Sequence, residues 1–381
     1  MKKLLLAPVV LTFASVAHAA DTPLSAALRD FANGQIERKQ VAGLLAEVGD
    51  KDQVLSRQTA GFADIATGKK IAADDLFWIA SMSKPVTGTA VMMAVEKGLL
   101  KVSDPVSTYL PEFKKLLGPD GKPASITIAQ CLSHTSGLQD LSPEESHTTT
   151  TLAELTAITA AKPLNFMPGT QWAYCQTGIN TAARVLEVVS GQSFPGFLSE
   201  KLFTPLGMTD TTFYPTAAQA ERLVTPYETT PDGLNPVALF IGFGKSLDDK
   251  SRCPSGAGGL FSTAADYGKF ARMILNGGQL NGKRFLTEAS VKEMTSSHTG
   301  ALQAGFVPGS AYGLGWICVA EPSGVTAPLS PGSFGHGGMY GTQAWIDPAK
   351  NRYTLLLVQR SNFGIGDASE TRSLFQEAAS K

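Results

Sequence analysis

The residues best suited to chemistry in this chain are a serine and a lysine three positions apart, Ser81 and Lys84. On a helix this spacing puts both side chains on one face, about one turn apart. A serine hydroxyl is unreactive at neutral pH until a base removes its proton, and a desolvated lysine with a lowered pKa can be that base. No other lysine of the chain has a serine three positions before it. The spacing predicts a nucleophile and its base, although a two-residue pattern also arises by chance.

The residues after Ser81 predict the helix that the pair requires. Pro85 is tolerated in the first turn of a helix, because a backbone N–H at that position has no acceptor within the helix. Apolar residues recur at helical spacing from Val86 onward, and Gly98 is placed to end the helix. Ser81 would then lie at a helix N-terminus, where backbone N–H groups and the helix dipole favour a developing oxyanion.

Acyl transfer also needs a group that delivers a proton to the leaving group. Tyr174, in an aromatic segment after the turn at Pro168 and Gly169, is the candidate. A tyrosine whose pKa is lowered by a nearby lysine ammonium could share this role. The alternative interpretation of Tyr174 is a half-buried core aromatic.

A second oxyanion donor is predicted at His336-Gly337-Gly338, just before an expected strand at residues 341–346. Paired glycines let a substrate approach the backbone closely. The backbone N–H of Met339 would then stabilise the oxyanion together with that of Ser81. The alternative interpretation is a glycine-rich turn.

His134, in His-Thr-Ser-Gly-Leu, is interpreted as structural, holding loop carbonyls near the site. The pattern Gly-x-Ser-x-Gly is absent from the sequence, so a nucleophile elbow of the α/β-hydrolase type is not indicated.

Together these segments resemble the serine β-lactamase superfamily, in the branch of class C β-lactamases, D,D-peptidases, D-aminopeptidases and family VIII carboxylesterases. The similarity covers nearly all of the chain after residue 19. Three motifs carry it: Ser81-Met82-Ser83-Lys84 matches the first, Tyr174-Cys175-Gln176 matches Tyr-x-Asn, and His336-Gly337-Gly338 matches Lys-Thr-Gly or His-x-Gly. The resemblance implies catalysis through an acyl-Ser81 intermediate, with Lys84 and Tyr174 moving protons.

Departures from the family pattern bear on the substrate. Gln176 stands where the family usually has Asn, and His336 and Gly337 stand where β-lactamases have the Lys and Thr that help hold a substrate carboxylate. A largely neutral imidazole and a glycine hold an anion less well. The resemblance therefore favours a carboxylesterase acting on small esters.

Two alternatives stay open. One is a D-Ala-D-Ala carboxypeptidase, a D-aminopeptidase or a weak β-lactamase, because His-x-Gly also occurs in peptidases of the superfamily. The other is a penicillin-binding sensor that is acylated without turnover. The intact set of Ser81, Lys84 and Tyr174 argues against a sensor.

The wider pattern predicts an α/β fold of the α+β type. A helix at residues 24–40 and a β-hairpin at 41–62 open the chain, and strands at 313–319, 341–346 and 353–358 precede a helix from about residue 369. Helices fill most of the interval. We expect one antiparallel sheet built from both ends of the chain and flanked by helices, with a mainly helical insertion. The expected division of residues 20–381 is a sheet region at 20–78 and 255–381 and a helical region at 79–254.

Residues 1–19 read as a secretory signal peptide, because Lys2 and Lys3 precede a short apolar run and Ala17-His18-Ala19 forms a cleavage site. A periplasmic or secreted location is therefore expected. No other apolar run is long enough to span a membrane. The 32 basic and 33 acidic residues leave a formal net charge of −1, which gives no electrostatic case for nucleic acid or an anionic membrane as partner.

The expected partner is a small ester, amide or peptide substrate. An exported protein can form disulfides, but the apolar flanks of the four cysteines favour buried free thiols. Neither these cysteines nor the histidines have metal-ligand spacing, so no metal or other cofactor is predicted. The cysteines are Cys131, Cys175, Cys253 and Cys318.

Overall fold

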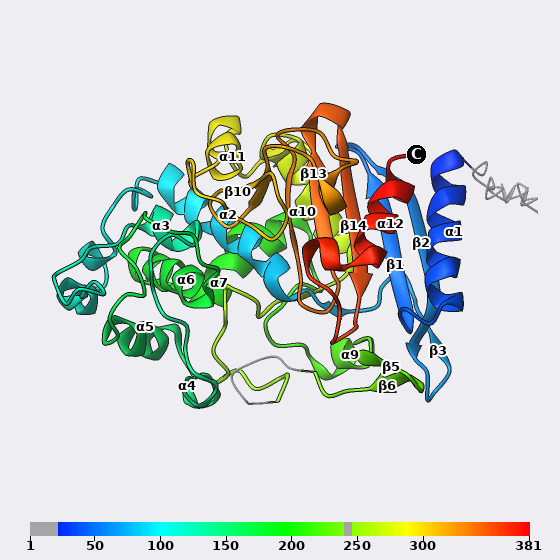
Figure 1. The fold of residues 1–381 in the computed structure, drawn as a ribbon, viewed down its shortest axis with the longest axis horizontal. Coiled ribbons are helices and arrows are strands. Elements are labelled where there is room, and N and C mark those ends of the chain that lie inside the picture. Colours follow the sequence, from blue (N-terminus) through cyan, green and yellow to red (C-terminus); the bar gives the residue numbers. More distant parts are fainter. Residues whose placement is uncertain (1–21, 240–245) are drawn as a thin grey trace, which may run out of the picture.

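An eight-stranded antiparallel sheet forms the centre of the protein, seen in a computed structural model that describes residues 22–239 and 246–381 (Figure 1). The predicted signal peptide lies outside the described residues. The strand order is β10-β11-β12-β13-β14-β1-β2-β3. The strands are β1 (Gly43–Gly49), β2 (Val54–Asp64), β3 (Lys69–Lys70), β10 (Ser310–Tyr312), β11 (Ile317–Val319), β12 (Phe334–Gly337), β13 (Gln343–Asp347) and β14 (Arg352–Val358). Because β1 pairs with β14, the two ends of the chain meet in the middle of the sheet, which confirms the predicted sheet class.

Helices cover both faces of this sheet. Strand β1 is buried along its whole length, and its alternate residues face opposite layers. Leu44, Ala46 and Val48 pack with the N-terminal helix α1 (Pro23–Glu37) and the C-terminal helix α12 (Glu370–Ala379), which lie side by side in Figure 1. Leu45 belongs to the core of the other face, where α10 (Ala264–Leu275) packs on β14, β1 and β13.

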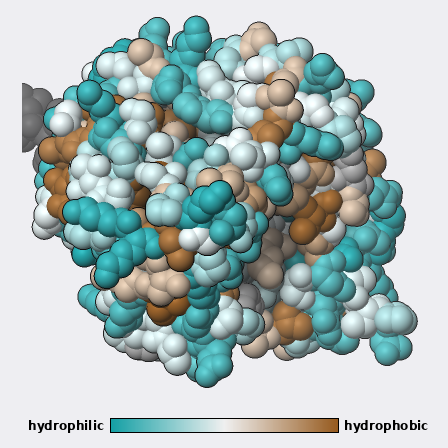
Figure 2. Space-filling view, turned by 60° about the vertical axis from the view of Figure 1, so that its left-hand side comes forward, coloured by the Kyte–Doolittle hydropathy of each residue, from teal (hydrophilic) through white to brown (hydrophobic). Residues whose placement is uncertain are grey.

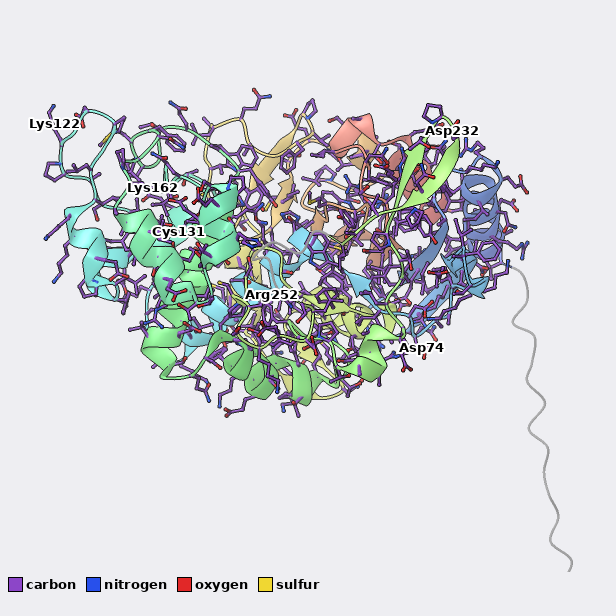
Figure 3. The ribbon with its side chains drawn as sticks, turned by 90° about the horizontal axis from the view of Figure 1, so that it is seen from below. Asp74, Lys122, Cys131, Lys162, Asp232 and Arg252 are labelled. Atoms are coloured by element: carbon purple, nitrogen blue, oxygen red, sulfur yellow. The ribbon has the colours of Figure 1, made fainter. Side chains whose placement is uncertain are left out.

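The helical region is a cluster around α6 (Gln176–Ser190), on the side of the molecule away from α1 in Figure 1. Helices α2 (Ser83–Glu96), α3 (Ile128–Leu132), α5 (Leu152–Ala160) and α7 (Phe194–Leu198) pack against α6. Gly191, at φ 67°, ends α6 in the left-handed conformation that glycine adopts without strain. The four cysteines are buried free thiols, and Cys131 lies inside this cluster (Figure 3).

Several β segments differ from the sequence prediction. Of the strand expected at 313–319, only residues 317–319 are extended, as β11. Residues 310–312 form β10, which was not predicted, and residues 313–316 connect the two strands. Strand β12 was not predicted, because its two glycines have low β-propensity and only pairing with β11 and β13 holds them extended. A hairpin of β5 (Tyr227–Thr230) and β6 (Gly233–Pro236) interrupts the helical region. Its turn, at Asp232, lies on the sheet side of the molecule in Figure 3.

Within the described residues, none of the helices has the length and apolar character needed to span a membrane. The face drawn in Figure 2 shows its hydrophobic residues in small patches separated by hydrophilic ones.

Helix α2 is held close to the segment between β10 and β11. A Cβ at Gly88 would lie 2.0 Å from the carbonyl oxygen of Leu314, so only glycine allows this approach. Gly315 has φ 84° and donates its N–H to the carbonyl of Leu132 in α3. The segment between β10 and β11 therefore lies directly against α2 and is hydrogen-bonded to α3.

We expect Gly88→Ala to destabilise the protein by about 1–3 kcal/mol, because the added methyl group has to push α2 away from the Leu314 carbonyl. Gly34→Ala in α1 is the matched control, since no atom lies within 4 Å of the position a Cβ would take there. The free energy of unfolding of Gly34→Ala should equal that of wild type or exceed it by up to about 1 kcal/mol, because alanine has a higher helix propensity than glycine. Urea unfolding of both variants measures the difference, and a Gly88→Ala protein as stable as wild type would contradict the close packing.

Candidate active site

Ser81 lies in a short 3₁₀ turn, η1 (Ala80–Met82), that leads directly into α2. Ala80 has φ 45°, a left-handed conformation that is uncommon for a residue with a Cβ. Such strain persists where the surrounding structure fixes it, and it is common at functional sites. Among the described residues the backbone N–H of Ser81 has no hydrogen-bond acceptor. Ser81 thus stands just ahead of a helix N-terminus, as the sequence predicted, with a backbone donor free.

Lys84 is fully buried behind Ser81. Its Nζ lies 3.1 Å from Ser81 Oγ, 2.7 Å from Gln176 Oε1 and 2.6 Å from the carbonyl oxygen of Ala257. Burial lowers the pKa of Lys84 to about 7, although the charge of Asp140 and the nearby Cys175 act in the opposite direction. A large fraction of this lysine is therefore neutral at physiological pH, and its lone pair can then accept the proton of Ser81.

Tyr174 lies next to the same pair, with Lys84 Nζ 4.6 Å from the centre of its ring. Burial raises the pKa of Tyr174 above its usual range, while hydrogen bonds with Ser81 and Gln176 act to lower it. The expectation that Lys84 lowers this pKa is wrong, because desolvation of the phenolate outweighs the opposing interactions. The raised pKa favours the neutral phenol of Tyr174, which can donate and relay a proton.

His336 is buried, and both of its ring nitrogens are engaged. Nδ1 is 2.7 Å from the carbonyl oxygen of Gly337, so it carries the proton and donates it there. Nε2 is 2.7 Å from Tyr312 Oη and accepts the phenol proton. Burial, helped by the charge of Lys84, lowers the pKa of His336 to about 3. The imidazole is neutral, as expected from the sequence, and neither nitrogen is available to a substrate anion.

His134 is structural, but its hydrogen bond is not the predicted one. Its Nδ1 accepts the backbone N–H of Cys175 at 3.1 Å, whereas the sequence suggested a bond to loop carbonyls. Its ring packs against Tyr174 and Tyr312, at centroid distances of 4.5 and 4.6 Å. His134 therefore holds the segment that carries Tyr174 and Gln176.

Asp140, which the sequence did not single out, fixes the start of α6. Its Oδ1 accepts both the backbone N–H and the hydroxyl of Thr177, each at 2.9 Å. The side chain of the N-cap residue Cys175 does not cap the helix, so the carboxylate of Asp140 caps it instead. The contact sets the position of Gln176, the first residue of the helix, beside Lys84.

Met339 follows Gly338 in the turn between β12 and β13. Gly338 donates its N–H to the carbonyl of Thr342 at 2.7 Å and accepts the N–H of Gly341 at 3.1 Å. The backbone N–H of Met339 has no acceptor in the described parts of the chain. His336 and Gly337 belong to β12 and are not part of this turn.

A cavity of about 410 Å³ joins these elements. It is lined by each of the predicted site residues apart from Lys84, which lies behind Ser81 and contacts it. Its other walls are mostly apolar or aromatic. The predicted residues on the cavity are Ser81, Tyr174, Gln176, His336, Gly337, Gly338 and Met339, and the apolar walls are Phe306, Val307, Ile317, Val325, Trp345, Phe363 and Ile365. In the described residues no group of three His, Cys, Asp or Glu side chains could hold a metal ion.

Comparison with known proteins places the chain in a family. The model of the family described as Beta-lactamase matches residues 28–378. The chain belongs to the beta-lactamase family. It is 29% identical to Esterase EstB of Burkholderia gladioli over 381 residues, covering 92% of each chain. It is 31% identical to Penicillin-binding protein 4 of Amycolatopsis lactamdurans over 299 residues, covering 77% of this chain and 73% of the relative.

A solved structure shows the same beta-lactamase fold. EstCE1, described as a hydrolase with promiscuous acyltransferase activity, superimposes with a TM-score of 0.80 at 24% identity, over 95% of this chain and all of EstCE1. The protein is thus a serine hydrolase of the β-lactamase fold, in a family that contains esterases and penicillin-binding proteins.

Proposed function

We propose that this protein is an exported carboxylesterase that hydrolyses small neutral esters through an acyl-Ser81 intermediate. The observation that supports it most is the 3.1 Å contact between Ser81 Oγ and Lys84 Nζ in surroundings that lower the lysine pKa to about 7. A nucleophile needs a base that is neutral at working pH and within hydrogen-bond reach. The export is proposed from the predicted signal peptide at residues 1–19.

In the proposed acylation, Ser81 Oγ attacks the ester carbonyl and its proton passes to neutral Lys84. The carbonyl oxygen becomes an oxyanion between the N–H groups of Ser81 and Met339. As the C–O bond breaks, the phenol of Tyr174 protonates the leaving alkoxide and regains a proton from the Lys84 ammonium. Water then attacks the acyl group, its proton goes to the Lys84–Tyr174 pair, and Ser81 leaves reprotonated.

The preference for neutral esters follows from the walls of the cavity. Phe306 and Ile365 are exposed apolar residues on its lining, and Met339 is a third. Exposed apolar side chains in a concave site favour an apolar ligand surface. His336 offers no charge and no free nitrogen to a carboxylate. The relative EstB, which carries the name esterase, supports the same choice.

A second candidate function is hydrolysis of carboxylate-bearing substrates, as in D-Ala-D-Ala peptides, D-amino acid peptides or β-lactams. The observation in its favour is Arg372, a guanidinium on the cavity lining with no carboxylate in ion-pair contact among the described residues. The ester remains our first choice, because this guanidinium already donates to the carbonyls of Gly338 and Gly364. Its Nε has no hydrogen-bond partner among the described residues, but it is buried. An acylated sensor without turnover is the remaining alternative.

A panel of p-nitrophenyl butyrate, nitrocefin and a D-Ala-D-Ala peptide tests the proposal. We expect the ester to have the highest kcat/KM with many turnovers per enzyme, and Ser81→Ala to lower that value by roughly 10⁴-fold or more, since it lacks the nucleophile. A wild-type preference for nitrocefin or the peptide would favour the second candidate. Product formation that stops after one equivalent would identify a sensor.

The pH dependence of kcat/KM tests Lys84 as the base. Because the base works in its neutral form, the rate should rise with pH, level off above the lysine pKa of about 7, and fall about tenfold per pH unit below it. Asp140→Asn keeps the oxygen that caps α6 but removes a negative charge that stabilises the ammonium, so the midpoint should move to lower pH. A midpoint unmoved by Asp140→Asn, or a rate that falls as pH rises through 7, would point to another base.

A further inference from the structure

The turn that carries Met339 is supported from behind by a residue far away in the sequence. Arg372 of α12 donates from Nη2 to the carbonyl oxygen of Gly338 at 2.8 Å and from Nη1 to that of Gly364 at 3.0 Å. The guanidinium is buried and lies 5.1 Å from the ring centre of Phe363. Burying a guanidinium without a carboxylate partner is costly, and such groups are kept where their hydrogen bonds fix something.

What Arg372 fixes is the orientation of one peptide group. The described residues contain no cis peptide bond, so the carbonyl of Gly338 and the N–H of Met339 point in opposite directions in one plane. The carbonyl is held by Arg372 and by the N–H of Gly341. The N–H of Met339 therefore points away from the guanidinium, and Met339 lines the same cavity as Ser81.

Apart from Arg372, the only other hydrogen-bond donor to the Gly338 carbonyl among the described residues is the Gly341 N–H, which closes the turn. Gly338 and Gly341 flank the turn, and glycine has more conformational freedom to lose than any other residue. A side chain at Gly338 is ruled out, because its Cβ would lie 2.0 Å from Thr342 Oγ1 and 2.6 Å from the Ile79 carbonyl oxygen. A cation on the carbonyl also polarises the peptide group and strengthens its N–H as a donor.

We propose that Arg372 is a positioning residue for the oxyanion site: it holds the Gly338 carbonyl so that the Met339 N–H is directed at the oxygen of the substrate carbonyl. The inference rests on the proposed acyl-Ser81 chemistry. It explains why α12, which covers the sheet on the side of α1, sends a long side chain to the cavity. Arg372 acts through the backbone and need not touch the substrate.

The test compares Arg372→Met and Arg372→Lys with a matched control, Arg360→Met. The Arg360 guanidinium stacks on the same Phe363 ring, at 5.8 Å, but donates to Gln40 and not to Gly338. Five quantities are measured for each protein: kcat and KM for p-nitrophenyl butyrate, kcat/KM for nitrocefin, the Ki of butylboronic acid and the melting temperature. The tetrahedral adduct of the boronic acid with Ser81 places an oxygen in the oxyanion site.

Complete loss of one oxyanion donor costs about 10²–10³-fold in kcat, so a donor that is merely misdirected should cost about 10–100-fold. We expect that loss in kcat for Arg372→Met, an increase of similar size in the boronate Ki, and little change in KM. Arg372→Lys should recover part of both, because an ammonium can still donate to the Gly338 carbonyl. Arg360→Met should change kcat and Ki less than about threefold, whatever it does to the melting temperature.

Unchanged boronate affinity in folded Arg372→Met would overturn the inference, and so would a loss confined to nitrocefin, which would make Arg372 a carboxylate anchor. If Arg372→Met does not fold, the test rests on Arg372→Lys. Boronate binding weaker than in wild type, at an unchanged melting temperature, supports the positioning role, and binding equal to wild type contradicts it. If the wild-type protein hydrolyses no ester, the proposed function is refuted. The boronate affinities of the Arg372 variants would still test whether Arg372 positions the Met339 N–H.

Discussion

The burial of the Lys84 amine is the constraint on which the site depends. A lysine removed from water resists protonation, and that resistance turns an ordinary cation into a group that is partly neutral near pH 7. The amine still needs acceptors when it is charged, and Ser81, Gln176 and the Ala257 carbonyl supply them. These three acceptors come from the turn before α2, the start of α6 and a loop before α10. The fold must therefore bring distant segments together before the lysine can be buried.

Several features of the fold serve this convergence. Gly88 lets α2 approach the segment between β10 and β11, and Asp140 fixes the start of α6 where Gln176 stands. His134 holds Tyr174 in place through the N–H of Cys175. Pairing of β12 with β13 presents the turn at Met339, which lines the same cavity. The site thus lies where the helical region meets the sheet.

The sequence was most informative where the function depends on side chains that are close together in the chain. Ser81 and Lys84 are one helical turn apart, so their contact follows from local geometry, and the motif order placed Tyr174 and the glycines near them. The sheet built from both ends was also predictable from strand patterns. Strand β12 was not predictable, because its glycines are typical of a turn. Only pairing with the neighbouring strands makes this segment a strand.

Other parts of the site depend on tertiary structure alone. The carbonyl of Ala257 has no side-chain signature, since any residue would provide it. The raised pKa of Tyr174 reflects desolvation, which a sequence does not show. The nearby Lys84 had suggested a lowered pKa instead. The contacts of Tyr312 with His336, of Asp140 with Thr177 and of Arg372 with Gly338 span 24 or more positions, so these roles appear only in the folded chain.

The most direct measurement of the central claim is the ionisation of Lys84 itself. Wild-type protein labelled with ¹³C at lysine Cε can be titrated by NMR without substrate, and the Lys84 signal is assigned from its loss in Lys84→Met. We predict a titration midpoint for Lys84 at about pH 7. A midpoint close to the usual lysine value of about 10.4 would contradict the account, because Lys84 would then be a permanent cation and not the base for Ser81.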